Sequence, residues 1–306
     1  MGFKYALNCD TLAFLGWDVL EDPQSVLKAA KEAGYDGVDL PGNPERVNAG
    51  SLRKVVDELD LTVPEVSGGW AWAGYEPGKE KYLCGPDQAA LLRGVDASKQ
   101  VIDLAVDLGA WLFPALAIQP PIFESPFSKL PIKVMRDTFL ESLQQICAYA
   151  GERGITVVVE PLSRYESFPG VATKVGEVVS LIEDLGAQNL GVQPDVYHMN
   201  LSEVSIPEAV RLGGKHIRHM HMNESNHYSL GTGHGEHHAI IRALKDVGYS
   251  GYLSIYMPIT TQEAWHRKQP ADLSAHLRWA IGYLKQIEAA VDLERLMYDT
   301  DASYAH

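Results

Sequence analysis

The strongest constraint on the fold is a pattern that recurs along most of the chain: an amphipathic helix, a glycine and a short apolar strand. In the first full copy, Asp22 can cap a helix and Gly34 can end it. Near the other end of the chain, Gly248 can end a helix in the same way as Gly34. The sequence contains eight strand candidates in all: residues 5–8, 37–40, 61–66, 111–116, 155–160, 190–195, 217–221 and 251–256.

This alternation predicts the architecture. Strands that alternate with helices indicate parallel strands joined by helical crossovers. Eight such units favour a closed barrel over an open doubly wound sheet. An open dinucleotide-binding sheet would also require Gly-x-Gly-x-x-Gly after its first strand, and residues 8–13 lack it. We therefore predict an α/β protein with a single domain, a (β/α)8 TIM barrel over residues 1–291, followed by a polar C-terminal tail at 292–306.

Composition and charge exclude several classes of function. The 306 residues include 26 Lys plus Arg and 40 Asp plus Glu, a net charge of −14. Binding to nucleic acid requires a basic face, so neither a nucleic-acid partner nor DNA-repair endonuclease activity is expected. The sequence shows no apolar run long enough for a membrane span and no secretory signal pattern, so we expect a cytoplasmic protein. The expected partners are a sugar or glycoside and other copies of the chain in a homo-oligomer, with a partner subunit as a further possibility.

Polar residues stand where the late apolar strands end. Glu160 follows three valines, Asp195 ends the next strand candidate, His221 the one after it, and Tyr256 the last. In a TIM barrel the carboxyl ends of the strands form one mouth, and catalytic residues lie there. Glu, Asp and His together suit a divalent ion such as Mn²⁺, Mg²⁺, Co²⁺ or Zn²⁺. Each residue alone could be a structural polar group bonded to loop backbone, but three on adjacent strands favour a metal site.

Histidine and tryptophan positions add candidates for a substrate site. Eight of the eleven histidines lie between His198 and His238, as expected for a metal site, a substrate site or a solvated loop. His198 closely follows the sixth strand candidate and is expected near the mouth. His237 and His238 precede a helix and are expected to be solvated. Trp70 and Trp72 follow the third strand candidate and could form a flat apolar wall for a sugar, or could pack the rim.

The second half of the chain contains three motifs: Glu160-Pro-Leu-Ser-Arg-Tyr-Glu166, Asp195-Val-Tyr-His198-Met-Asn200 and His219-Met-His221-Met-Asn-Glu224-Ser-Asn226. These motifs resemble the xylose-isomerase-like TIM-barrel superfamily, and most closely its ketose 3-epimerase branch (tagatose and psicose 3-epimerases). The resemblance runs through most of the chain. It implies a divalent metal, most often Mn²⁺, held by Glu160, Asp195 and His221. It also implies that Glu166 and His198 contact substrate oxygens.

Two positions depart from the family's pattern. The resemblance implies a second metal-bound glutamate where this chain has Tyr256, and a substrate-binding arginine where it has His227. In ketose epimerases the two glutamates are understood to act on opposite faces of the substrate carbon. Tyrosine has a reference pKa near 10 and replaces a carboxylate poorly in that role. A reaction with one base and one weak acid fits better, and Glu224, Asn226 or water could supply the missing ligand.

Three functions are compatible with these residues. The first is a divalent-metal-dependent sugar isomerase or epimerase that abstracts a proton next to a carbonyl and forms an enediolate, with Glu160 or His198 as the base. The second is a lyase that eliminates from 3-oxo-glycosides, as C-glycoside deglycosidases do. The third is a sugar-binding barrel that lost catalysis with its fourth metal ligand. The catalytic candidates are Glu160, His198 and Tyr256, and the substrate-binding candidates are Glu166, His198, His227, Trp70 and Trp72.

Overall fold

The computed structural model describes residues 2–10, 12–67, 79–117, 132–163, 171–256 and 272–303. Its strands pair in parallel, in two groups with the orders β2–β1–β7–β6 and β3–β4–β5. The strands are β1 (Lys4–Asn8), β2 (Gly37–Asp39), β3 (Leu112–Ala115), β4 (Thr156–Val159), β5 (Leu190–Val192), β6 (Met220–Met222) and β7 (Tyr252–Tyr256).

Isolated backbone bridges join the two groups into a ring. Residues 62–66 bridge β2 on one side and β3 on the other, in the position of the third predicted strand. Pro64 lies in the middle of this segment and has no N–H to donate, which explains why the segment forms bridges instead of a continuous ladder. Two further bridges, one of them between Asp195 and His221, connect β5 to β6. The eight predicted strand positions are therefore confirmed, and the fold is the predicted TIM barrel.

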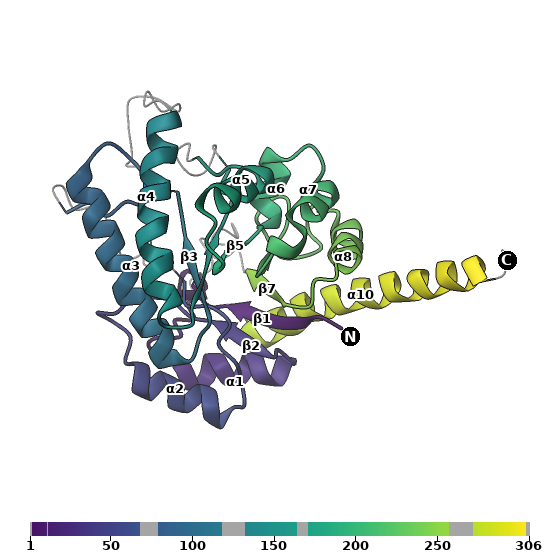
Figure 1. The fold of residues 1–306 in the computed structure, drawn as a ribbon. Coiled ribbons are helices and arrows are strands. Elements are labelled where there is room, and N and C mark those ends of the chain that lie inside the picture. Colours follow the sequence, from purple (N-terminus) through teal and green to yellow (C-terminus); the bar gives the residue numbers. More distant parts are fainter. Residues whose placement is uncertain are drawn as a thin grey trace.

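Helices surround this ring of strands (Figure 1). The predicted caps of the first helix are present, because the Asp22 side chain accepts a hydrogen bond from the N–H of Ser25 and Gly34 adopts a φ of 94°. The described helices are α1 (Pro23–Ala33), α2 (Ala49–Glu58), α3 (Gln88–Leu108), α4 (Ile132–Gly151), α5 (Val175–Leu185), α6 (Val196–Ser202), α7 (Ile206–Gly213), α8 (His237–Asp246) and α10 (Leu273–Ser303), with 3-10 turns η1 (Leu12–Leu15) and η2 (Gly214–His216).

The buried residues of the strands include apolar and polar side chains. Leu7, Val158 and Ile255 are among the apolar ones, and each is at most 1% exposed. Toward the carboxyl ends of the strands the buried residues become polar, and they include Asp39 and Gln193. This arrangement directs titratable groups to the mouth of the barrel, where the sequence predicts a site.

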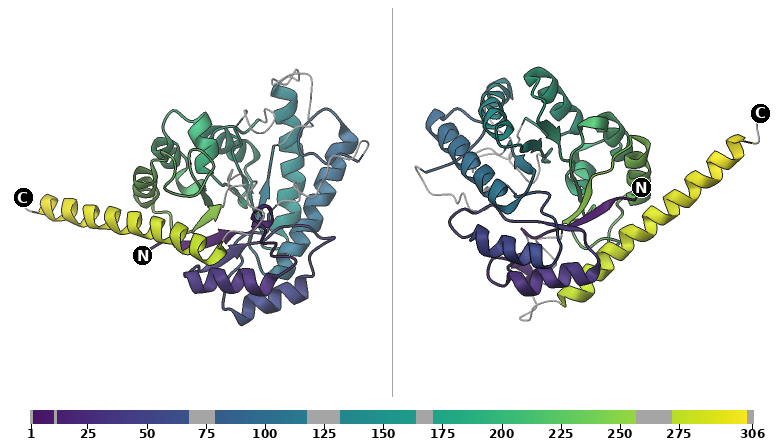
Figure 2. Two further views of the ribbon diagram at one scale, coloured as in Figure 1. Left: turned by 180° about the vertical axis from the view of Figure 1, so that it is seen from behind. Right: turned by 60° about the horizontal axis from the view of Figure 1, so that its bottom comes forward.

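The C-terminal residues belong to a long helix. α10 continues without interruption from Leu273 to Ser303, so the predicted boundary between barrel and tail, at residues 291 and 292, lies inside it. Figure 2 shows that the last part of α10 projects beyond the barrel. Among the helices within the described ranges, none has the length and apolar composition that crossing a membrane requires.

Candidate functional site

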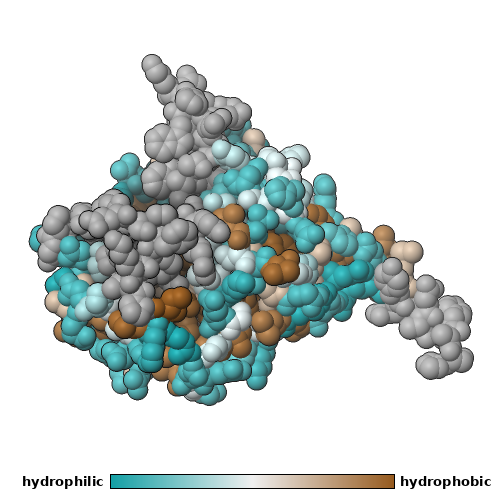
Figure 3. Space-filling view, turned by 90° about the horizontal axis from the view of Figure 1, so that it is seen from above, coloured by the Kyte–Doolittle hydropathy of each residue, from teal (hydrophilic) through white to brown (hydrophobic). Residues whose placement is uncertain are grey.

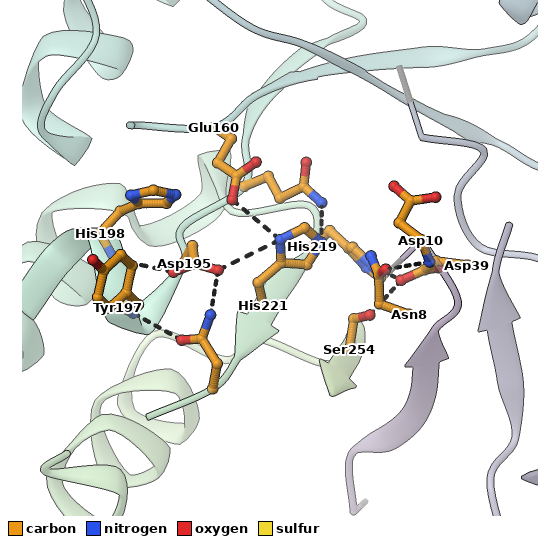
Figure 4. A network of polar contacts seen from close by, with 12 residues as sticks. Asn8, Asp10, Asp39, Glu160, Asp195, Tyr197, His198, His219, His221 and Ser254 are labelled. Atoms are coloured by element: carbon orange, nitrogen blue, oxygen red, sulfur yellow. Dashed lines mark hydrogen bonds and ion pairs between the residues drawn. The ribbon is translucent and has the colours of Figure 1, made fainter. Parts of the chain in front are cut away.

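The three residues predicted as metal ligands lie together at the carboxyl ends of the strands (Figure 4). Glu160 directly follows β4, Asp195 begins the turn into α6, and His221 lies within β6. The Nδ1 atom of His221 is 3.2 Å from Glu160 Oε1 and 3.7 Å from Asp195 Oδ2. All three residues are buried, with at most 9% of their surface exposed. Two carboxylates and one imidazole nitrogen that converge in this way fit a divalent cation.

The Asp195 carboxylate is fixed by its position at the start of α6. Its Oδ1 accepts a hydrogen bond from the N–H of His198 at 3.0 Å and thereby caps the helix. Its Oδ2 accepts from Asn223 Nδ2 at 2.7 Å, and the Asn223 oxygen accepts in turn from the N–H of Tyr197 at 2.8 Å. Because both oxygens are held, the one that faces His221 is oriented before any ligand binds.

The opposite ring nitrogen of His221 contacts Gln193. His221 Nε2 lies 2.8 Å from Gln193 Nε2, which also donates to Glu65 Oε2 at 2.6 Å. Gln193 Oε1 is buried without a hydrogen-bond partner among the described residues. Turning this amide by 180° gives His221 Nε2–H an acceptor, because the two amide atoms are nearly indistinguishable in shape. The same oxygen then faces Glu65 Oε2 and can accept a hydrogen bond from the protonated carboxyl, since burial raises the pKa of Glu65 well above its usual value. In that tautomer the Nδ1 lone pair of His221 faces Glu160 and Asp195, as binding of a cation requires.

The charges of the site are consistent with a cation between these groups. Burial alone would lower the pKa of His221, but the charge of Glu160, a hydrogen bond to it and the charges of Glu65 and Asp195 raise that pKa to about 10. Burial alone would raise the pKa of Glu160, but the charge of His221 and its hydrogen bond lower it. A positive charge is therefore favoured at His221 Nδ1, and a proton or a metal ion can supply it.

His198 lies beside this group in an orientation that makes it a hydrogen-bond donor. One of its ring nitrogens is within 4.8 Å of oxygens of both Glu160 and Asp195. Its Nδ1 accepts a hydrogen bond from the N–H of Ser163 at 3.2 Å. A neutral imidazole that accepts at Nδ1 carries its proton on Nε2. His198 is thus better suited to donate a hydrogen bond to a substrate oxygen than to act as a base or as a metal ligand.

Tyr256 and His227, the two residues that depart from the family's pattern, contact each other. Their ring centroids are 5.7 Å apart with 4° between the planes, and Tyr197 stacks on the other face of His227 at 4.1 Å and 8°. Tyr256 also stacks on His221, at 5.5 Å and 28°. The backbone of His227 has a φ of 59°, in the left-handed region that few non-glycine residues adopt. The loop is therefore shaped to bring His227 into the stack.

Glu224 holds that loop. Its carboxylate accepts hydrogen bonds from the backbone N–H groups of Ser225, Gly231 and Gly235, at 2.9 to 3.1 Å, and it is 1% exposed. Burial alone would raise its pKa, but the nearby His237 and these backbone groups lower it. These contacts favour a structural role for Glu224, in which it caps its own loop, over the role of replacement metal ligand that the sequence left open.

The environment of His237 corrects one prediction. His237 was expected to be solvated but is 1% exposed, with Nε2 at 2.8 Å from the carbonyl of Asn223 and Nδ1 near the Tyr283 hydroxyl. These partners are distant in sequence, so no local pattern identifies them. His238 is partly exposed, as predicted. The predicted substrate-binding residues Glu166, Trp70 and Trp72 lie outside the described residues.

Several further residues shape the site. Asp39 accepts hydrogen bonds from Ser254 Oγ and, at 2.8 Å, from His219 Nε2. Asp10 follows β1, accepts from Ser67 Oγ at 2.7 Å, and has a pKa raised to about 6, mainly by burial. A signal for some of them exists, because side chains two positions apart on a strand share a face. By this spacing Gln193 shares a face with Asp195. His219 and Asn223 share a face with His221 in the same way.

Comparison with known proteins agrees with this fold. The profile of the family described as "Xylose isomerase-like TIM barrel" matches residues 27–283. An L-ribulose 3-epimerase of Mesorhizobium japonicum is 28% identical over 232 residues, which are 76% of this chain and 74% of that protein. A 3-dehydro-D-guloside 4-epimerase of Escherichia coli is 23% identical over 243 residues, 76% of this chain and 86% of that protein. A solved structure of an L-ribulose 3-epimerase has a TM-score of 0.79 at 22% identity and covers 97% of this chain and 98% of its own.

Proposed function

This chain belongs to the xylose isomerase-like TIM-barrel family, and we propose that it is a divalent-metal-dependent sugar epimerase or isomerase that acts on a keto-sugar. The observation that carries the proposal is the convergence of Glu160 and Asp195 on Nδ1 of His221 at the barrel mouth. Similarity to sugar epimerases supports the same class of reaction, although at 23–28% identity it leaves the substrate open. Two carboxylates and one imidazole suit several divalent ions, and we propose Mn²⁺ among them because the resemblance to ketose 3-epimerases implies it.

In this proposal Glu160, Asp195 and His221 hold the metal. The bound ion would act as a Lewis acid that polarises the substrate carbonyl and its neighbouring hydroxyl. Glu160 is the base, because its carboxylate lies at the barrel mouth beside His221, and it takes the proton from the carbon next to the carbonyl. His198 donates from Nε2 to the substrate oxygen on which negative charge develops. These roles account for the removal of the proton and for the formation of the enediolate.

The return of the proton is assigned to Tyr256. Its ring stacks on His221, so its side chain lies next to the proposed metal ligands. Its hydroxyl is a weak acid, in contrast to a carboxylate, and it donates a proton more readily to a strongly basic enediolate than it accepts one from carbon. We place His227 in the wall of the substrate pocket with it, together with Glu166, Trp70 and Trp72.

A second function, elimination from a 3-oxo-glycoside, is favoured by one comparison. The E. coli relative is named for an oxidised glycoside, 3-dehydro-D-guloside, which is a substrate of the type that this reaction requires. The same base would remove a proton next to the carbonyl, and Tyr256 would then protonate the departing group. Both functions begin with removal of this proton. They differ in whether the aglycone then leaves the sugar.

Deuterium incorporation tests the proposal directly. The full chain is loaded with Mn²⁺ and incubated in D₂O with free ketoses and, separately, with 3-oxo-glycosides, and the products are followed by NMR. We expect deuterium at the carbon next to the carbonyl, with an epimer or isomer from an epimerase and a released aglycone from a lyase. Glu160→Gln should lower exchange at least about a hundredfold, whereas Glu152→Gln, on the exposed surface, should not. Sugar binding without exchange on any substrate would overturn the proposal in favour of a binding protein.

A further inference from the structure

A cleft lies at the amino ends of β5 and β6, on the face of the barrel opposite the mouth. Its volume is about 440 Å³, and it is lined by the end of α5, the start of β5 and the segment that leads from η2 into β6. Arg218 in this cleft is only three residues before His221. An odd spacing along an extended segment turns the two side chains to opposite faces, and Arg218 is exposed whereas His221 is buried. The cleft is therefore separate from the proposed metal site.

The cleft gathers cationic side chains that the rest of the protein leaves unpaired. Hydrophilic residues are spread over the described surface in Figure 3, so polarity alone marks no site. Most Lys and Arg side chains of the described ranges form ion pairs, as Arg136 does with Asp184 on α5. Lys215 and Arg218, which line the cleft together with His216, have no carboxylate partner within the described residues, in a chain whose net charge is −14. Unpaired cations in a concave surface attract an anion.

Gly191 allows the Arg218 side chain to lie where it does. A Cβ atom at position 191 would be 2.2 Å from Cγ of Arg218 and 3.0 Å from the carbonyl oxygen of His216. The aliphatic part of Arg218 therefore crosses β5 directly over the glycine. The backbone beside it is also fixed, because the N–H of Arg218 donates to the carbonyl of Val192 at 3.0 Å. A guanidinium whose stem is packed in this way loses less conformational freedom when it binds a ligand.

The wall formed by α5 offers hydrogen-bond acceptors. α5 ends at Gly186, which has a φ of 65°, and the last carbonyl groups of a helix have no partner within the helix. Glu183 also lines the cleft and has no ion-pair partner in the described ranges. Carbonyl and carboxylate oxygens repel an anion but accept hydrogen bonds from hydroxyl groups. A ligand that fits both walls thus combines an anionic group with hydroxyl groups.

Phosphate is the anion that best matches the cationic wall. An arginine presents a planar fork of N–H groups to two oxygens of one phosphate, and a lysine adds a compact charge. We propose that this cleft binds a phosphorylated sugar, with its phosphate on Lys215 and Arg218 and its hydroxyl groups toward Glu183 and the end of α5. The volume of the cleft lies in the usual range of small-molecule sites, about 300–1,000 Å³. The proposal does not depend on the function of the mouth.

Binding of sorbitol 6-phosphate to the full chain tests the proposal. This probe carries a phosphate and several hydroxyl groups but no carbonyl on which the mouth could act. Metal is first removed with a chelator, so that phosphate cannot bind to an ion at the mouth. We expect titration calorimetry to show saturable binding of sorbitol 6-phosphate with an affinity at least about tenfold higher than that of inorganic phosphate. Sorbitol itself should give no measurable binding, because it lacks the charged group.

Substitutions on the two walls should act differently. Arg218→Gln should weaken the binding of both phosphate compounds at least about tenfold, because it removes the bidentate donor. Lys28→Gln is the matched control, since it removes the same charge from an exposed residue of α1 that pairs with Glu32. Glu183→Ala should strengthen the binding of inorganic phosphate, because a repelling charge is lost, and should reduce the preference for sorbitol 6-phosphate. All three side chains are exposed, so melting temperatures should stay close to that of the wild-type protein.

Two results would overturn the proposal. Equal affinities for sorbitol 6-phosphate and inorganic phosphate would make the cleft a site for the free anion only. Absence of binding, or binding that Arg218→Gln leaves unchanged, would mean that Lys215 and Arg218 only offset the negative end of the α5 dipole. Should Arg218→Gln lower the melting temperature, Lys215→Gln repeats the test at a second exposed position of the same wall, with the same loss of affinity expected.

Discussion

The ring of Tyr256 lies parallel to the ring of His227, with their centroids 5.7 Å apart and 4° between their planes. One residue ends β7 and the other belongs to the loop after β6, so they are distant in sequence. They are also the two positions at which the chain departs from the ketose 3-epimerase pattern. Because Tyr256 and His227 contact each other, the two departures form one aromatic surface beside the proposed metal ligands. The two residues should therefore be tested together.

Removal of the Tyr256 hydroxyl separates its chemical role from its packing role. Tyr256→Phe keeps a ring that can stack on His221 and His227. If the hydroxyl returns the proton, we expect turnover to fall about a hundredfold or more, with Mn²⁺ retention and melting temperature unchanged. His227→Ala is the comparison, because it removes the stacking partner and keeps the hydroxyl. Equal turnover of Tyr256→Phe and the wild-type protein would show that the tyrosine only packs.

Retention of metal measures the proposed ligand set without reference to a substrate. After loading with Mn²⁺ and desalting, we expect about one ion per chain by elemental mass spectrometry. Asp195→Asn should lose most of this metal, because the amide replaces a charged ligand while it can still accept the hydrogen bond from the N–H of His198. Glu152→Gln should retain it, since that residue is on the surface. Full retention by Asp195→Asn would remove Asp195 from the ligand set.

Gln193 offers a test of how His221 is oriented. Gln193→Leu removes the contact at His221 Nε2 and leaves the carboxylates that face Nδ1 in place. Partners of this type usually change metal affinity ten- to a hundredfold when they are replaced. We expect a loss of Mn²⁺ affinity in that range, measured by titration calorimetry. An unchanged affinity would show that β6 alone orients the imidazole.

The barrel and the centre of the site could be predicted because local patterns specify them. Helix, glycine and strand recur in order, and the carboxyl ends of parallel strands meet at one mouth, which brings Glu160 and Asp195 to His221. The burial of His237 and the continuation of α10 could not be predicted in this way. They depend on partners far along the chain, such as Tyr283 for His237 and α8 for the charged residues of α10. Charged residues on a helix face look solvated until the helix that pairs with them is known.

Glu224 should prove important for stability through the loop that carries His227. Its carboxylate accepts three backbone hydrogen bonds in a buried position, and Glu224→Gln places an amide N–H₂ where only acceptors fit. We expect the free energy of unfolding to fall by about 2–4 kcal/mol in urea titrations. Glu236→Gln is the control, because Glu236 lies on the same loop, is exposed and caps α8 without a side-chain hydrogen bond. Similar losses in both variants would contradict the role of Glu224.

The pKa of Asp10 predicts a dependence of stability on pH. Burial raises this pKa from 3.8 to about 6, although the hydrogen bond from Ser67 lowers it. Between these two pH values the folded chain holds a proton on Asp10 that the unfolded chain has released. Stability contributed by Asp10 therefore decreases as the pH rises through this window, by up to about 3 kcal/mol. Asp10→Asn does not titrate and should escape this loss.

The measurement compares variant and wild-type protein in chelator, so that metal binding does not contribute. The difference in free energy of unfolding, Asp10→Asn minus wild type, should increase from pH 4 to pH 7 by up to about 3 kcal/mol. Asp60→Asn, at a fully exposed side chain, should show a nearly constant difference over the same range. A constant difference for Asp10→Asn as well would mean that water reaches this carboxylate in the folded protein, because only a desolvated carboxylate would hold its proton up to pH 6.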